Sequence, residues 1–278
     1  MEEAGLQEYL ARFRAEFPSF QGFGASPEFD DNERSYKLDI VNAFQEKVAP
    51  GLNDLPSEEA KLSELGESIV SLFHENLPTL GAPQNLVGWR YCTPLRKLTA
   101  SQKAKLARVT ADLCYGPDDI AARVDRFVPA LRAMLGDQAE SMSWPAASRS
   151  LTSFLLMAAD PANHAIIKTR EFNRALRDLG YNPLQNGPLT GEEYKRVQAF
   201  TKELRDALSQ AGLTPRDLID VQSFIWCAVA QPTQERNYWL VGATWWGKED
   251  KTDEFVREQR WENGNEDRYL DLVRNVRT

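Results

Sequence analysis

The sequence has few of the side chains that most catalytic sites need. Its 278 residues include only two histidines and three cysteines. His74 and His164 stand far apart, with no second His or Cys at ligand spacing, which leaves little material for a zinc site or a histidine-based triad. Cys92, Cys114 and Cys227 form no Cys-x-x-Cys pair and are expected to be reduced, buried side chains. The leading expectation is a chain with no catalytic residue, no metal ligand and no cofactor.

Long apolar runs are also missing. No stretch approaches the roughly 18 consecutive apolar residues of a membrane span, and the acidic start MEEAGLQEY lacks the basic and apolar regions of a signal peptide. We therefore expect a cytoplasmic protein that has no membrane partner. A composition of 42% hydrophobic and 27% charged residues is typical of a folded globular chain rather than a disordered one.

Charge, in contrast, is present and unevenly distributed. Residues 1–85 hold 6 Lys/Arg against 16 Asp/Glu, a balance of −10, whereas the rest of the chain holds 27 against 25, a balance of +2. Within the rest, residues 86–111 include six basic residues and no acidic one, so this segment can attract phosphates although the whole chain carries −8. The candidate nucleic-acid-binding residues of this segment are Arg90, Arg96, Lys97, Lys103, Lys105 and Arg108.

A second basic group follows further along the chain. Arg170, Arg174 and Arg177 are spaced i, i+4 and i+7, which places them on one face of a helix, beside Lys168. Such a row suits contacts to successive phosphates of nucleic acid. An ordinary solvated face is the default interpretation of this row, with nucleic acid or an acidic protein partner as the alternatives.

Apolar residues recur at helical spacing through most of the chain, which predicts a mainly α-helical fold. Thr99 with Gln102, and Thr190 with Glu193, predict capping boxes that begin two of the helices. The last predicted helix is apolar around nearly its whole circumference, so we expect it to be the most buried one, with Trp226 in the packed interior. Helices are predicted over about residues 6–17, 40–48, 62–73, 99–115, 117–135, 190–211 and 214–230.

The pattern changes after Pro232. Residues 238–241 form a short apolar run with aromatic and β-branched side chains, which predicts a strand, and two short helices are predicted over 252–257 and 265–276. We therefore divide the chain into an acidic N-terminal helical segment (1–84), a helical domain that packs with it (85–232) and the start of a second, β-containing module (233–278). We expect this short α/β segment to be truncated. Four tryptophans near its strand are candidates for stacking a base, with an aromatic core as the equal alternative: Trp239, Trp245, Trp246 and Trp261.

A metal-dependent nuclease or hydrolase is a less favoured alternative. Asp217 and Asp220 lie three residues apart in the first turn of a predicted helix and could chelate a metal, although carboxylates there also complement the helix dipole. Glu193 and Lys195 match half of a nuclease motif, yet they fall on a predicted capped helix rather than on a strand. Each of these groups thus has a local structural explanation.

Two stretches of the chain resemble a known family. DLIDVQSFIW at 217–226, and WLVGATW at 239–245 followed by Phe255 and WENG at 261–264, are similar to the region ahead of the motor in McrB-like AAA+ ATPases of modification-dependent restriction and phage defence. NLVGWR at 85–90 is similar to part of the same helical region. The resemblance implies a helical segment followed by an EVE/PUA-like module, whose aromatic pocket holds a modified base.

The resemblance also implies what this chain does. Walker A, Walker B and arginine-finger motifs are absent from it. The chain is therefore expected to be a non-catalytic recognition or adaptor region of an antiviral restriction ATPase, with DNA, including modified DNA, as its partner. An AAA+ motor domain in the full-length chain and a nuclease subunit would be further partners. The alternative is a protein–protein interaction module that docks a motor or nuclease.

Overall fold

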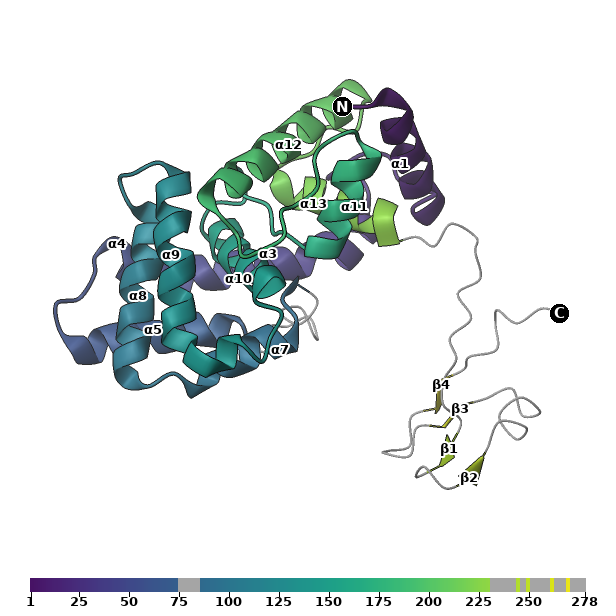
Figure 1. Cartoon of the computed structure of the whole chain (residues 1–278). Coiled ribbons are helices and arrows are strands. Elements are labelled where there is room, and N and C mark those ends of the chain that lie inside the picture. The colour runs from purple at the N-terminus through teal and green to yellow at the C-terminus, as the bar shows by residue number, and fades with distance from the viewer. Residues whose placement is uncertain (75–85, 231–243, 246–248, 251–260, 263–268, 271–278) are drawn as a thin grey trace. The chain divides into compact units, whose positions relative to one another are not determined.

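The chain forms two compact units, Met1–Gln231 and Pro232–Thr278, which are described separately (Figure 1). The first unit is mainly α-helical in its described part, as the sequence predicts. Of the helices in that part, none is both long and apolar enough to cross a membrane. The computed structural model describes residues 1–74 and 86–230 and the strand residues 244–245, 249–250, 261–262 and 269–270.

Helices α1, α3, α5, α8, α9, α12 and α13 overlap the predicted apolar stripes, since each stripe gives one face that can be buried. Pro129 lies inside α9 without ending it. The α-helices are α1 (Glu3–Glu16), α2 (Pro27–Phe29), α3 (Ser35–Lys47), α4 (Ala49–Asn53), α5 (Glu59–Leu72), α7 (Trp89–Cys92), α8 (Ala100–Tyr115), α9 (Ile120–Leu135), α10 (Trp144–Ala159), α11 (Thr169–Asp178), α12 (Gly191–Gln210) and α13 (Leu218–Ala230). A π-helical turn, η1 (Asp30–Arg34), and two 3-10 turns, η2 (Thr93–Lys97) and η3 (Gly136–Ala139), join some of them.

The two predicted capping boxes have different outcomes. At the start of α8, the Gln102 N–H donates to Thr99 Oγ1 (3.3 Å) and the Thr99 N–H donates to the Gln102 side chain (2.8 Å), which confirms the box. At the start of α12, Thr190 Oγ1 accepts from the Glu193 N–H (3.2 Å), but the Glu193 carboxylate pairs with Arg149 of α10 instead of returning to the cap. The second box is therefore only half right, because a buried cation holds its carboxylate.

The helices pack in two groups that share central helices. In one group α8 contacts both α5 and α9, and in the other α13 contacts α1, α11 and α12. α10 contacts α3, α8, α9 and α11, and Figure 1 shows α3 and α10 between the two groups. A cluster of aromatic rings closes the core around α13: the Phe13 ring of α1 lies 5.1 Å from Phe224 and 5.8 Å from Phe29.

Helix α13 is buried without interruption from Leu218 to Ile225, but the prediction for Trp226 is wrong. Trp226 is only partly buried, and the Lys168 ammonium lies over its ring, 4.1 Å from the centroid. The side chain is amphipathic and sits at the edge of the core, where a cation covers it. α10, where no helix is predicted from the sequence, is buried just as continuously, from Ala147 to Ala158.

The described residues of the second unit form short antiparallel strand pairs. β1 (Thr244–Trp245) pairs with β2 (Glu249–Asp250), and β3 (Trp261–Glu262) pairs with β4 (Tyr269–Leu270). The helix predicted over 265–276 is therefore wrong at β4, where an aromatic residue favours pairing with a neighbouring strand. The strand predicted over 238–241 and the helix predicted over 252–257 lie outside the described residues.

Candidate nucleic-acid interface

The basic segment 86–111 runs through α7, η2 and the first three turns of α8. Two side-chain hydrogen bonds fix the backbone of α7. His74 Nε2 donates to the Cys92 carbonyl oxygen (2.8 Å), and Thr93 Oγ1 donates to the carbonyl of Trp89 (2.9 Å). The apolar side chains beneath it are buried, namely Leu86, Val87, Cys92, Pro94, Leu95 and Leu98. Five of the six charged side chains of this segment are exposed, and Lys103 is partly buried.

Two of the six predicted cations are already neutralised. Lys103 pairs with Glu67, and Arg108 pairs with Glu59. Both carboxylates belong to α5, the acidic helix that packs along α8. These two cations therefore have less to offer a phosphate than the sequence suggests.

The other four cations are exposed and free of such pairing. Within residues 1–74 and 86–230, no carboxylate lies within ion-pair distance of any of them. We call this set the α7–α8 basic surface; it consists of Arg90, Arg96, Lys97 and Lys105.

An exposed aromatic ring lies on the same surface. Trp89 begins α7 and is 61% exposed, the largest exposure among the large hydrophobic residues of the described part of the chain. The Arg90 guanidinium lies over its ring, with Cζ 5.4 Å from the centroid. An aromatic ring and the guanidinium of its neighbour Arg90 therefore occur together at the start of α7.

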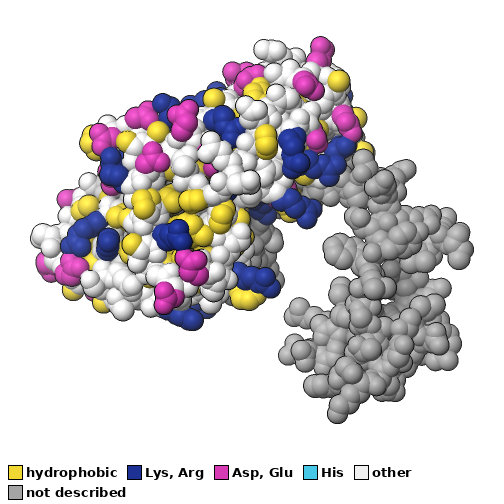
Figure 2. Space-filling model, in the orientation of Figure 1, with side chains coloured by type: hydrophobic (Ala, Val, Ile, Leu, Met, Phe, Trp, Pro, Cys, Tyr) yellow, Lys and Arg dark blue, Asp and Glu magenta, His cyan; other side chains and the backbone are white. Residues whose placement is uncertain are grey.

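The arginine row of α11 is present, but it is partly neutralised. Arg170 is 88% exposed on its side chain and approaches Glu171, while Arg174 pairs with Asp178, both at 3.5 Å. Arg177 is exposed and donates to the carbonyl of Asn173 (3.1 Å). Figure 2 shows Lys and Arg side chains gathered over α11.

Lys168 does not lie with this row. Its ammonium turns to the Trp226 ring, and burial lowers the pKa of Lys168 below that of a free lysine. Trp226 is thus the side chain that Lys168 covers, and the candidate phosphate contacts of α11 reduce to its three arginines.

The tryptophan candidates fall in the second unit. Trp245 pairs with Glu249 across β1 and β2, and Trp261 pairs with Leu270 across β3 and β4. Trp239 and Trp246 lie outside the described residues. Base stacking by these tryptophans stays a prediction.

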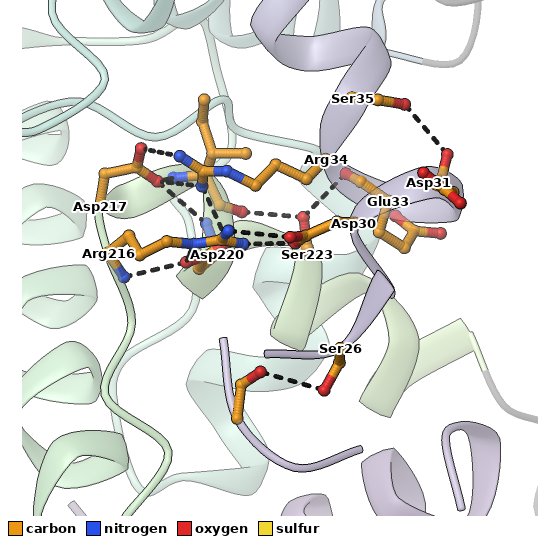
Figure 3. Close-up of polar contacts among 12 residues, drawn as sticks. Ser26, Asp30, Asp31, Glu33, Arg34, Ser35, Arg216, Asp217, Asp220 and Ser223 are labelled. Atoms are coloured by element: carbon orange, nitrogen blue, oxygen red, sulfur yellow. Dashed lines mark hydrogen bonds and ion pairs between the residues drawn. The ribbon is translucent and has the colours of Figure 1, made fainter. Parts of the chain in front are cut away.

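The two aspartates of the nuclease alternative lie together, but arginines hold them (Figure 3). Arg34 Nη2 contacts Asp217 Oδ2 at 2.6 Å, and its Nη1 contacts Asp220 Oδ1 at 2.8 Å. Arg216 Nε donates to Asp220 Oδ2 (2.9 Å). Asp217 also accepts from the N–H of Ile219 (3.0 Å), which is the helix-terminus role that its position predicts.

Glu193 and Lys195 are engaged elsewhere. The Glu193 carboxylate is fully buried against the Arg149 guanidinium, whereas Lys195 reaches Asp119 at 3.6 Å. Over the described residues, no group of three or more His, Cys, Asp or Glu side chains could hold a metal ion. The four groups of the nuclease alternative therefore do not converge on a shared metal site within that part.

The histidines and cysteines have structural surroundings. His164 is buried, with Nδ1 3.0 Å from the Tyr194 hydroxyl, and burial lowers the pKa of His164 to about 4. Cys92, Cys114 and Cys227 are free thiols; Cys92 and Cys227 are buried as expected, whereas Cys114 is only partly buried. Burial raises the pKa of Cys92 to about 12. A thiol with so high a pKa is a poor nucleophile at neutral pH.

Sequence reasoning missed one exposed feature and one buried feature. Trp89 stands in a stretch whose charge and resemblance draw attention to its basic residues. One isolated tryptophan gives no pattern from which its exposure can be predicted. Lys37 is fully buried, and its Nζ lies 2.6 Å from Ser223 Oγ.

No protein-family model, curated protein or solved structure matches this chain.

Proposed function

We propose that this chain is a non-catalytic recognition or adaptor region that contacts DNA through the α7–α8 basic surface. The observation that carries the proposal is the set of four exposed cations that no described carboxylate neutralises. Phosphates are the partners that such cations attract most generally, and each contact releases a counterion from DNA. The α11 row is second in rank because Glu171 and Asp178 already approach two of its arginines.

The resemblance to McrB-like ATPases supplies the wider setting of this proposal. In that setting the helical unit sits ahead of an AAA+ motor of a restriction or phage-defence system and cooperates with a nuclease subunit. The second unit would be an EVE/PUA-like module that reads a modified base. The tryptophans of that unit are what supports this assignment.

The test is a salt titration of DNA binding by the whole chain, measured by fluorescence anisotropy on a labelled duplex. If all four cations contact phosphates, the log–log slope of the binding constant against salt is about −3.6. Alanine at Arg90, Arg96, Lys97 or Lys105 should each lower affinity and reduce the magnitude of the slope by about 0.9.

A charge-matched control separates phosphate contacts from net charge. Arg132 of α9 is comparably exposed but pairs with Glu140 at 2.6 Å, so Arg132→Ala removes the same charge from a neutralised site. Its slope should equal that of the parent. Equal loss in Arg132→Ala and Lys97→Ala would refute the assignment of the surface. No binding to any DNA at low salt would leave the protein–protein adaptor in its place.

A further inference from the structure

The α7–α8 basic surface combines two features that duplex DNA does not need together. Duplex binding without sequence readout requires cations alone, because the bases are stacked inside the helix. Single-stranded nucleic acid exposes base faces, and proteins that bind it combine cations along the backbone with an aromatic ring on which a base stacks. Trp89 and the neighbouring cations match this second combination.

The backbone that carries Trp89 is anchored, although the ring itself is largely exposed. α7 is anchored on both sides by buried residues, and the Trp89 carbonyl itself accepts from Thr93 Oγ1 at 2.9 Å. Arg90 lies over the ring, so the guanidinium and the indole already form one layer of a stack. A single exposed hydrophobic residue is ordinary on a protein surface. An exposed indole under a guanidinium, in a segment that holds three further exposed cations, is a more specific arrangement.

We infer that Trp89 and Arg90 form a stacking platform for a base of single-stranded nucleic acid, with Arg96 and Lys97 on the adjoining phosphates. This inference rests on the proposed function, since it names the form of nucleic acid that the same surface prefers. Stacking on an aromatic side chain tolerates every base because every base has a π face. The platform therefore selects an unpaired strand and no particular sequence.

The experiment compares two probes with the whole chain: a labelled oligo-deoxythymidine of about 15 nucleotides, which cannot pair with itself, and a duplex of the same length. Trp89→Ala should weaken binding to the single strand by between about 5-fold and about 150-fold and change duplex binding by less than about 2-fold. Trp89→Phe keeps an aromatic ring and should retain most of the affinity. Leu55→Ala, at another exposed apolar side chain, is the control and should change neither.

A second measurement does not depend on the alanine variant. A stacked base quenches indole fluorescence, so oligo-deoxythymidine should quench the parent more strongly than Trp89→Phe. Equal quenching, together with single-strand affinity unchanged in Trp89→Ala while duplex binding persists, overturns the stacking platform and leaves the proposed function standing. If the parent binds neither probe at low salt, both fail.

Discussion

Glu193→Ala removes the carboxylate that neutralises a buried guanidinium, and we expect it to destabilise the helical unit strongly. Arg149 Nη2 contacts both carboxylate oxygens of Glu193 (3.0 and 2.8 Å), and its Nε contacts one of them (3.1 Å). The side chains are 2% and 0% exposed. Glu193 also accepts from the N–H of Gln185 (2.6 Å), so the carboxylate ties α10, α12 and the loop between α11 and α12 together.

The magnitude follows from what the substitution leaves behind. Removing one partner of a buried ion pair typically costs about 3 to 5 kcal/mol, because the other charge stays buried without compensation. The Gln185 N–H also loses its acceptor, but Gln185 is exposed, so water can replace the carboxylate there and this loss adds little. A domain has roughly 5 to 15 kcal/mol of stability in total. Glu193→Ala should therefore remove at least about a fifth of it.

Urea unfolding followed by circular dichroism measures the effect, with the slope of the transition compared between parent and variant. The double variant Arg149→Met/Glu193→Leu removes both charges and should recover at least about 2 kcal/mol relative to Glu193→Ala. Recovery is incomplete because Arg149 also donates to the carbonyls of Pro145 (2.7 Å) and Gln185 (2.8 Å). A loss below about 1 kcal/mol in Glu193→Ala, or a double variant less stable than it, would contradict this account.

Three further predictions concern pH, packing and the edge of the core. The pKa of His164 is lowered to about 4 in the folded state, so the unfolded chain binds more protons below pH 6.5 and stability falls as pH drops toward 4. His164→Asn should reduce the loss in unfolding free energy between pH 7 and pH 4.5 by about 2 to 3 kcal/mol, measured by urea unfolding at both. A Cβ at Gly66 of α5 would lie 2.1 Å from the Lys103 carbonyl oxygen of α8, so Gly66→Ala should cost about 1 to 3 kcal/mol in the same assay despite the better helix propensity of alanine. Trp226→Ala should cost less than the roughly 3 to 5 kcal/mol of a fully buried aromatic, and at least about 1 kcal/mol less than Phe224→Ala.

Each of these has an outcome that would contradict it. A pH dependence unchanged in His164→Asn would show that other groups set the acid limit. Gly88→Ala is the control for Gly66→Ala, since the nearest atom to a Cβ there is 3.7 Å away and its φ of −58° suits alanine. Similar midpoints for the two glycine variants would argue against close packing of α5 on α8. A loss in Trp226→Ala equal to that of Phe224→Ala would place the indole in the interior.

Most helices could be predicted from the sequence because the forces that define them act over three or four residues. The apolar stripe of α8 and the Thr99 capping box are read from adjacent turns, and both are present. The second box failed in part for the opposite reason. The partner of Glu193 is Arg149, 44 residues earlier, and no local spacing reveals such a pair.

The burial of Lys37 could have been predicted from its position in the sequence. Lys37 precedes Ile40 and Val41 by three and four residues, so it lies on the same apolar stripe. A lysine there must find a polar partner or lose its charge, and burial lowers the pKa of Lys37 to about 8. The stripe predicts the burial. It cannot predict Ser223, 186 residues later, as the group that accepts from the lysine.

The sequence predicts which cations belong to the candidate site, but not how many of them remain unpaired in the folded chain. Six cations without an acidic neighbour in sequence suggest six phosphate contacts, yet Glu59 and Glu67 of α5 neutralise two of them. Those carboxylates belong to the acidic first third, whose charge appeared separate from the basic segment. Folding brings the two charge blocks together, so the charge balance of a segment gives only an upper limit on the cations available to a ligand.

Buried contacts also hold the acidic first third of the chain against helix α13. Lys37 and Arg34 reach Ser223, Asp217 and Asp220, all at or near the start of α13. These contacts are largely buried, and the aromatic cluster of α1 closes over the same helix. Residues 1–74 are therefore not a detachable acidic arm, because α13 would lose its ion pairs and part of its apolar cover without them. Their charge is fixed in place, and none of the carboxylates of residues 1–74 pairs with the four cations of the α7–α8 basic surface.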